Sequence, residues 1–296
     1  MQTETAASRA QIGFRSHDPR LQPIADKVMA GERLNFNDGL VLYGSSDVLA
    51  VGWLANHVRE RMHGDITYFN VNRHINPTNV CVANCRLCAF GRKKGDANGY
   101  TMALEEAWET AASGYSEAVT EFHIVGGLHP DLPLEYFLDL VSGLKQRFPK
   151  VHIKAFTMVE VAFLARRAKL TIEQTLIKLR DAGVDSMPGG GAEIFASRVR
   201  AIICDHKIDG EEWLETARLA HKLGFRSNAT MLYGHIENDE DRVDHLLKLR
   251  AVQDEPGGFR HFRCGRTTLL HSTGSRACGP CARSRATRCR RSCGRR

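Results

Sequence analysis

The sequence contains no run of about 18 apolar residues, the minimum length for a membrane-spanning helix. Its first 18 residues are polar and lack the apolar core of a secretory signal peptide. We therefore expect a cytoplasmic protein without a membrane partner. Because cytoplasmic thiols stay reduced, the nine cysteines are expected to be metal ligands or thiols without a functional role, rather than a disulfide framework.

Acidic residues and lysine are absent from residues 263–296, which contain ten arginines. Subtracting this +10 from the net charge of +7 leaves −3 for residues 1–262, so a basic nucleic-acid footprint would rest on the tail alone. No helical or strand period continues into the tail beyond "TTLL". We expect an aberrant, disordered tail at 263–296 and a fold that is cut short at its sixth strand.

One alternative for the tail is a zinc-dependent nucleic-acid module. Its cysteines would be the ligands: Cys278, Cys281, Cys289 and Cys293. No aromatic residue interleaves the arginines and no helical pattern follows them, so we expect no nucleic-acid partner.

The rest of the chain alternates between short β-rich runs and amphipathic segments. Strands are predicted at 71–76, 121–125, 151–156, 184–187, 226–232 and 259–262, and helices at 102–113, 134–147, 171–182, 211–223 and 239–253. Such alternation predicts an α/β fold with a parallel sheet, as a partial or full barrel over residues 66–262. Residues 1–65 are expected to form a helical extension, with a helix capped by Ser46 and ending near Gly64.

Three closely spaced cysteines follow the first strand directly. Cys81, Cys85 and Cys88 stand in the spacing C-x3-C-x2-C. Three thiolates can bind three irons of a [4Fe–4S] cluster and leave the fourth iron open for a ligand. A Cys3His zinc site that uses His74 or His123, and three unligated thiols, are the two alternatives.

This spacing after the first strand of a βα barrel resembles the radical S-adenosylmethionine (SAM) superfamily. The resemblance implies a (βα)6-type partial TIM barrel, a [4Fe–4S] cluster, and SAM as a co-substrate that binds the open iron and yields a 5′-deoxyadenosyl radical. The family often has an aromatic residue before the third cysteine, whereas this sequence has Leu87.

Candidate ligand-binding residues follow the other strands. "VGGLHP" supplies Gly126 and Gly127, which resemble the family's turn at the SAM amino group, although Leu128 stands where an acid is usual. "TMLYGHIE" resembles the family's adenine-contacting pattern and supplies Leu232, Gly234 and Glu237. Both stretches are equally compatible with ordinary turns after buried strands.

Three residues on the same rim are candidates for catalysis. Glu193 in "PGGGAEIF" is suited to holding a ribose hydroxyl, acting as a base or orienting a histidine, and His129 and His235 are the histidines within reach. Nearby, Arg198 and Arg200 are either donors to a substrate carboxylate or solvated helix residues.

A narrower resemblance rests on "HINPTNVCVANCRLCAFGRKKG", "GGGAEIF" and "SNATMLYGHIE". These stretches are similar to the transferases of the futalosine pathway of menaquinone biosynthesis. The resemblance implies addition of the 5′-deoxyadenosyl radical to a small carboxylate, 3-[(1-carboxyvinyl)oxy]benzoate, giving 6-amino-6-deoxyfutalosine. It also implies an external electron donor of flavodoxin or ferredoxin type. The alternatives are a cyclase-like radical SAM enzyme of the same pathway and a catalytically impaired, truncated fragment.

Overall fold

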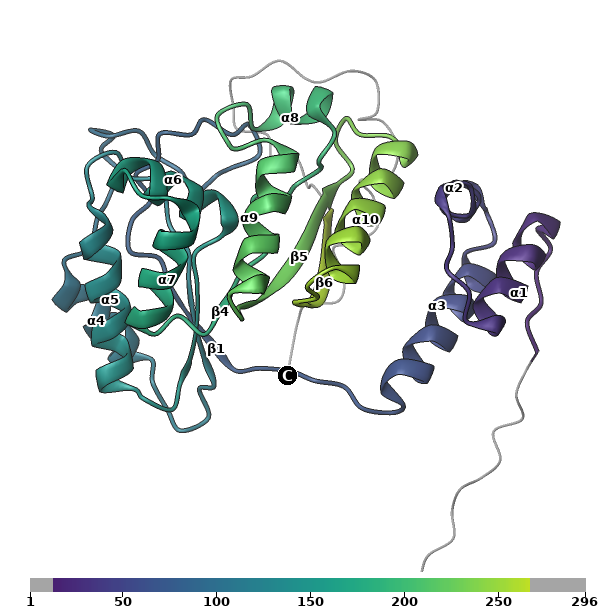
Figure 1. The fold of residues 1–296 in the computed structure, drawn as a ribbon, viewed down its shortest axis with the longest axis horizontal. Helices are drawn as coiled ribbons and strands as arrows, with labels where there is room; N and C mark the ends of the chain where they lie inside the picture. The colour runs from purple at the N-terminus through teal and green to yellow at the C-terminus, as the bar shows by residue number, and fades with distance from the viewer. Residues whose placement is uncertain (1–12, 267–296) are drawn as a thin grey trace, which may run out of the picture.

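The computed structural model describes residues 13–266. They form a small group of helices at the N-terminal end and a larger part in which helices cover one sheet (Figure 1). No helix within residues 13–266 is long and apolar enough to cross a membrane. The cysteines considered for a zinc module, and most of the tail, lie outside the described residues.

The N-terminal part consists of η1 (Pro19–Leu21), α1 (Gln22–Ala30), α2 (Phe36–Gly44) and α3 (Val48–His63). It encloses its own apolar core, in which Leu21, Ile24 and Leu54 are buried. The helix expected to end near Gly64 is confirmed, but the prediction that Ser46 caps it is wrong. Asp47 caps α3 instead, because its carboxylate accepts a hydrogen bond from the Ala50 backbone N–H at 3.1 Å.

Six parallel strands form one sheet in the order β1-β2-β3-β4-β5-β6, which is the predicted partial barrel. Their bounds are β1 (Asn72–Ile75), β2 (Glu121–Ile124), β3 (His152–Ala155), β4 (Ser186–Met187), β5 (Arg226–Tyr233) and β6 (Phe259–Arg266). All six lie where the sequence predicts them. The last strand continues past the expected end at residue 262, pairing with β5 as far as Arg266.

The helices that follow the strands are α4 (Leu104–Ser113), α5 (Leu134–Arg147), α6 (Met158–Ala168), α7 (Ile172–Ala182), α8 (Ser197–Ile203), α9 (Gly210–Lys222) and α10 (Asp239–Asp254). Five of them were predicted, and the capping box of Thr171 and Gln174 at the start of α7 is confirmed. Helices α6 and α8 were not predicted.

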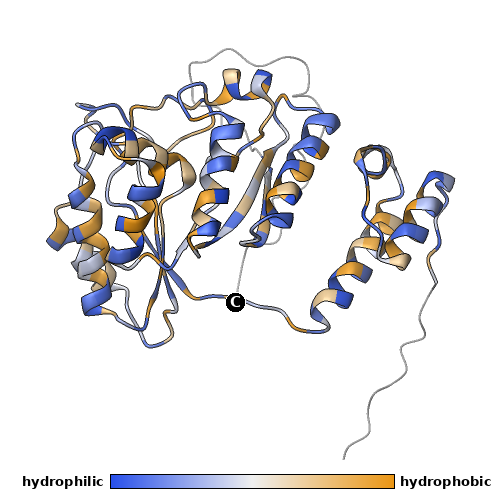
Figure 2. Cartoon of the chain, viewed as in Figure 1, coloured by the Kyte–Doolittle hydropathy of each residue, from blue (hydrophilic) through white to orange (hydrophobic). Residues whose placement is uncertain are grey.

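The two faces of the sheet differ in polarity. Phe122, Ile124 and Ile153 point outward and are fully buried under the helices, where they belong to the main apolar core. Hydrophobic and hydrophilic residues alternate along these helices (Figure 2). The alternate positions, such as His123 and Lys154, point to the inside of the barrel. The core that stabilises the barrel therefore lies between sheet and helices, not inside the barrel.

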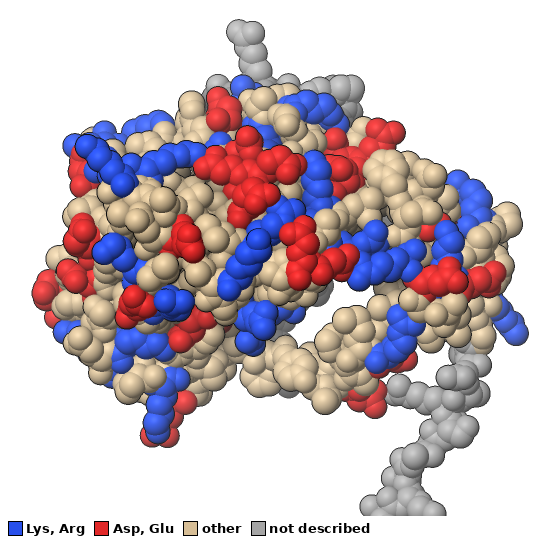
Figure 3. All heavy atoms as spheres, in the orientation of Figure 1, with Lys and Arg blue, Asp and Glu red and all other residues tan. Residues whose placement is uncertain are grey.

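The N-terminal helices contact the barrel through α10. The guanidinium of Arg33 binds both carboxylate oxygens of Asp254, at 2.5 and 2.7 Å, and Arg250 donates to the Leu34 carbonyl at 2.7 Å. Gly39 of α2 lies so close to α10 that a Cβ atom there would be 2.8 Å from the Val243 side chain. Both signs of charge are interspersed on the face shown in Figure 3.

Candidate functional site

The loop that carries the three cysteines is closed by its own backbone. Val80 pairs with Arg92 in a parallel bridge, and the Cys81 N–H donates to the Arg92 carbonyl at 2.8 Å. At the base of the loop, the Thr78 hydroxyl donates to the Tyr100 carbonyl at 2.8 Å and Thr78 pairs with Thr101. These contacts hold the cysteines directly after β1, as predicted.

The three cysteines line one cavity of about 180 Å³. The Cys88 N–H donates to the Cys85 carbonyl at 3.0 Å, and the Gly91 N–H points at the Cys88 sulfur, with 3.3 Å between N and Sγ. Cys85 is half-buried, and burial raises its pKa to about 11. The structure thus brings Cys81, Cys85 and Cys88 to one cavity.

A single-metal site is not assembled around these thiols. Residues 13–266 contain no group of three or more His, Cys, Asp or Glu side chains that could hold one metal ion. His74 and His123, the suggested fourth ligands, lie on β1 and β2 and stack on each other with 4.8 Å between ring centroids. The donor set therefore fits a cluster, whose thiolates bind separate irons, better than a Cys3His zinc ion.

Gly126 and Gly127 line the same cavity. The Gly127 N–H donates to the Thr78 carbonyl at 2.8 Å, and a Cβ atom at Gly127 would lie 2.2 Å from the Val80 carbonyl oxygen. Gly126 is also close, because its Cβ would be 3.2 Å from the Thr78 oxygen. These glycines therefore let the turn after β2 pack against the backbone that leads into the cysteine loop.

Glu160 is a cavity residue that the sequence analysis missed. It stands in the first turn of α6, where one carboxylate oxygen accepts from the Thr157 N–H and hydroxyl, both at 2.7 Å. The other oxygen accepts from the Gly126 N–H at 2.9 Å. Burial raises the pKa of Glu160 above its usual range, and these three hydrogen bonds offset only part of that rise. Glu160 thus brings an acid to the turn at Gly126, although the sequence there has no acid.

Lys207 is a second missed residue on this cavity, and it comes from the loop after α8. Its ammonium donates to Glu193 at 2.7 Å. Burial alone would raise the pKa of Glu193, but Lys207 holds it below its usual range. Glu193 itself has a left-handed backbone with φ of 46°, and its carbonyl accepts from the Leu232 N–H at 2.9 Å.

Arg200 fixes the glycine-rich segment that contains Glu193. Its buried guanidinium donates to the carbonyls of Ala192 at 2.7 Å and Ile208 at 2.5 Å, and to further carbonyls of the segment. Arg198 pairs with Asp241. Arg200 is therefore neither a solvated residue nor an unoccupied donor for a substrate, and its role is to position the loop.

The turn after β5 is held together by its own side chains. The Glu237 carboxylate accepts from the Gly234 N–H at 2.6 Å, the His235 N–H at 3.0 Å and Arg242 at 2.6 Å. Burial alone would raise the pKa of Glu237, but these hydrogen bonds together lower it to about 2. Both ring nitrogens of His235 are engaged, with Ile236 N–H and the Leu232 carbonyl.

His129 lies on the loop after Gly127 and outside the residues that line the cysteine cavity. Its Nδ1 accepts from the N–H groups of Asp131 and Leu132, both at 3.1 Å. Burial lowers the pKa of His129. Nδ1 therefore accepts from the backbone of the turn, and Nε2 is the ring nitrogen without a hydrogen-bond partner among residues 13–266.

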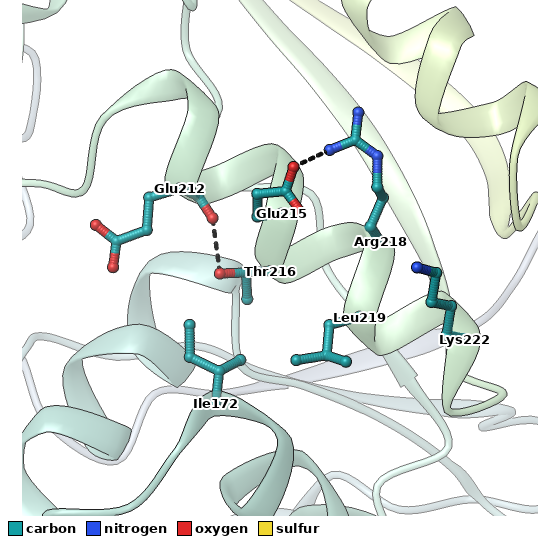
Figure 4. Close-up of a pocket in the computed structure, with 7 residues that line it drawn as sticks. All are labelled: Ile172, Glu212, Glu215, Thr216, Arg218, Leu219 and Lys222. Atoms are coloured by element: carbon teal, nitrogen blue, oxygen red, sulfur yellow. Dashed lines mark hydrogen bonds and ion pairs between the residues drawn. The ribbon is translucent and has the colours of Figure 1, made fainter.

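A second pocket, of about 200 Å³, lies between α7 and α9 on the outer side of the barrel (Figure 4). Its polar groups are used locally: the Thr216 hydroxyl donates to the Glu212 carbonyl at 2.7 Å, and Arg218 pairs with Glu215. This pocket contains none of the candidate residues.

Residues 75–249 match the model of the radical SAM superfamily. The cysteine loop, the parallel half-barrel and this match define the class, and the chain belongs to the radical SAM superfamily. It is 49% identical over 245 residues to aminodeoxyfutalosine synthase of Thermus thermophilus, covering 83% of this chain and 66% of that protein. It is 48% identical over 239 residues to aminodeoxyfutalosine synthase of Streptomyces coelicolor, covering 81% of this chain and 62% of that protein.

The chain thus spans less than two thirds of the length of these two relatives. Among solved structures, methylornithine synthase (PylB) shares the fold with a TM-score of 0.62 at 18% identity, over 83% of this chain and 68% of that one. At this identity the likeness supports the half-barrel fold alone.

Proposed function

We propose that Cys81, Cys85 and Cys88 bind a [4Fe–4S] cluster whose fourth iron takes SAM. The observation that carries this proposal is that three thiols from one loop line the same cavity as Gly126, Glu160 and Lys207. When bound, the reduced cluster supplies the electron that cleaves the sulfonium. The Gly91 N–H beside the Cys88 sulfur is the type of hydrogen bond that tunes a cluster's potential.

Glu160 and Lys207 have complementary roles in holding the amino-acid part of SAM. A carboxylate accepts about four hydrogen bonds, and Glu160 has three partners among the described residues. An ammonium has three donors, and Lys207 uses one of them within the same residues. We assign the amino group of SAM, as a donor of N–H hydrogen bonds, to Glu160, and its carboxylate to Lys207.

The other predicted site residues remain proposals with narrower roles. Glu193 is proposed to accept a ribose hydroxyl. Gly126 and Gly127 are proposed to admit the ligand at the turn after β2, and the turn with Leu232, Gly234 and Glu237 to contact the adenine. His129 is the proposed proton carrier through Nε2. His235 was a candidate for the same task, but its ring is fixed by two hydrogen bonds.

The similarity to two aminodeoxyfutalosine synthases supports a specific reaction. The adenosyl radical adds to the enol-ether double bond of 3-[(1-carboxyvinyl)oxy]benzoate. Rearrangement, addition of water and loss of bicarbonate then give 6-amino-6-deoxyfutalosine and methionine. The electron that cleaves SAM is returned when the product radical is oxidised, so the sum is redox-neutral. We propose a flavodoxin- or ferredoxin-type donor for that electron. We also propose that the enzyme acts in the cytoplasm, where its thiols stay reduced.

The test is product formation by the anaerobically reconstituted chain with SAM, strong reductant and the carboxyvinyloxy-benzoate, followed by mass spectrometry. The expected result is 6-amino-6-deoxyfutalosine, with adenosyl carbon derived from labelled SAM. Formation of a cyclised product from dehypoxanthine futalosine, without adduct from the benzoate, would assign the chain to the cyclase instead.

A further inference from the structure

One guanidinium, that of Arg242 on α10, connects the turn after β5 to the N-terminal helical extension. Its Nε and Nη2 groups donate to the same Glu237 oxygen, at 2.9 and 2.6 Å, and its Nη1 group donates to Asp239 at 2.6 Å. Its central carbon lies 5.6 Å from the ring centroid of Tyr43 on α2 and 5.9 Å from that of Tyr233 at the end of β5. Two carboxylates and two aromatic rings therefore contact this single cation.

The packing of α2 on α10 brings Tyr43 to this cation. Gly39 and Tyr43 are four residues apart on α2, so they lie on the same face of that helix. Gly39 packs on Val243, the neighbour of Arg242 on α10, so closely that a Cβ atom at Gly39 would be 2.8 Å from the Val243 side chain. The close approach of the two helices at Gly39 thus places the Tyr43 ring within the distance of about 6 Å at which an aromatic face attracts a guanidinium.

The Glu237 carboxylate depends on Arg242 to balance its charge. The Glu237 side chain is fully buried, and a buried carboxylate that loses its cation is strongly destabilising. The same carboxylate shapes the turn, because its two oxygens accept from the backbone N–H groups of Gly234 and His235. A guanidinium that moved away from Glu237 would therefore weaken the contacts that give the turn its shape.

Tyr43 restricts the freedom of this guanidinium from outside the barrel. Arginine has many rotamers, and holding it in one of them has an entropic cost. Asp239 does not fix Arg242 against the turn, because Asp239 belongs to α10 itself and its side chain is 46% exposed. Burial raises the pKa of Tyr43, so its hydroxyl stays protonated and the attraction is that of the neutral ring for the cation.

We infer that Tyr43 is a positioning residue for the SAM site, because it holds Arg242 against Glu237 and so keeps the turn after β5 in the shape that receives the adenine. The inference rests on the proposed function, which assigns the adenine to this turn. Tyr43 is not among the residues that line the cysteine cavity. The helical extension therefore contributes to SAM binding through one cation and without contacting the cysteine cavity.

The test is anaerobic calorimetric binding of SAM and of its two parts, 5′-deoxyadenosine and methionine, to the reconstituted full chain. Tyr43→Leu keeps an apolar side chain but removes the aromatic ring. It is expected to weaken the binding of SAM and of 5′-deoxyadenosine by the same factor, roughly threefold, and to leave methionine binding unchanged. Tyr43→Phe retains the ring and is expected to bind all three ligands as the wild type does. Arg33→Gln, which breaks another contact between the extension and α10, is expected to do the same.

Arg242→Gln tests whether Tyr43 acts through this cation. Loss of the charge is expected to weaken 5′-deoxyadenosine binding about tenfold or more. Tyr43→Leu is expected to cause no further loss in that background, because two residues that act through one contact are not additive. Iron content and circular dichroism show which variants are folded, and the two Tyr43 variants decide the question if Arg242→Gln is not.

A loss confined to SAM and 5′-deoxyadenosine in Tyr43→Leu, with Tyr43→Phe unchanged, supports the inference. An equal loss for methionine, an equal loss in Tyr43→Phe, or unchanged binding of 5′-deoxyadenosine overturns it, as does a wild type that does not bind 5′-deoxyadenosine. The proposed function is judged separately by adduct formation. A chain with the selective loss but no adduct would keep this role for Tyr43 and lose the proposed function, whereas adduct formation with an unaffected Tyr43→Leu variant would do the opposite.

Discussion

At the scale of single residues, the cysteines fall into two kinds. Cys81, Cys85 and Cys88 line the cavity, whereas Cys204 is buried in a small apolar cluster with Ile203. Changing any one of the three loop cysteines to Ala removes the ligand of one iron, so each variant is expected to lose the cluster. Cys204→Ala is the matched control and is expected to keep about four irons per chain after reconstitution. Full iron content in the Cys88→Ala variant would refute the assignment.

Gly127 is a residue whose missing side chain has a structural purpose. An alanine Cβ would lie 2.2 Å from the Val80 carbonyl oxygen, a backbone atom that cannot rotate away. Gly127→Ala is therefore expected to lower the free energy of unfolding by about 1–3 kcal/mol and to reduce iron uptake. Urea unfolding and iron analysis measure the two effects.

Gly52 of α3 is the control for this substitution, because a Cβ there would meet no atom of residues 13–266 within 4 Å. Gly52→Ala is expected to stabilise the chain by roughly 0.5–1 kcal/mol through helix propensity. Equal effects of the two substitutions would show that the turn at Gly127 has room for a side chain.

At the scale of elements, α9 is tied to two strands by a buried histidine. His221 bonds the Ser227 hydroxyl of β5 at 2.8 Å, and its ring packs edge-on against Phe259 of β6. Burial lowers the pKa of His221 to about 4, below the 6.5 of an exposed histidine. Protonation therefore favours the unfolded chain. This contribution to stability is complete above pH 6.5 and is lost as the pH falls toward 4.

Between pH 6.5 and pH 4, the protonation of His221 is expected to lower the free energy of unfolding by about 3 kcal/mol. His221→Gln, which keeps a hydrogen bond to Ser227, is expected to flatten the fall in unfolding free energy between pH 6.5 and 4, leaving the part due to buried His245. Denaturant unfolding at a series of pH values measures this. The exposed His63→Gln variant should retain the wild-type profile, and a His221→Gln profile parallel to wild type would contradict the argument.

Most strands and helices were predictable from the sequence, but helices α6 and α8 were not. The strands were predicted as short β-rich runs between helical segments, such as the runs that contain Phe122 and Ile153. Helix α6 is buried nearly all round, and it was missed although Thr157 and Glu160 form the capping box that marks a helix start. Helix α8 has only seven residues.

The cluster ligands, which lie on one loop, were predictable from the sequence. The residues that only the fold brings to the cavity were not. Cys81, Cys85 and Cys88 are adjacent in the sequence, and their spacing is enough to find them. Lys207 has no local motif, and only the path of the chain after α8 brings it to Glu193 and the cavity. Glu160 carries a signal, its capping box, but that pattern alone indicates a helix and not a ligand.

At the scale of the whole molecule, we propose that residues 13–65 form a helical extension docked on α10 of the barrel core. The exposed Arg33–Asp254 pair contributes little, because surface ion pairs are worth about 0–1 kcal/mol. Close packing of Gly39 on Val243 is the more specific contact. Gly39→Ala is therefore expected to loosen the extension and to speed proteolysis of the exposed segment 64–71.

Gly44, in the same helix, provides the control. A Cβ there would meet no atom of the described part of the chain within 4 Å, so Gly44→Ala gains helix propensity without a clash. Its rate of cleavage in segment 64–71 should equal that of the wild type. Identical rates for all three proteins would show that the Gly39 contact does not hold the extension.

The central claim is that the three-cysteine loop holds a cluster whose open iron binds SAM through its amino and carboxylate groups. The most direct measurement is pulsed electron–nuclear double resonance on the reduced, reconstituted chain with SAM labelled by ¹⁵N at the amino group and ¹⁷O at the carboxylate. The account predicts hyperfine coupling of both labels to the cluster. A reduced [4Fe–4S] signal of full intensity that shows no coupling to either label would contradict it.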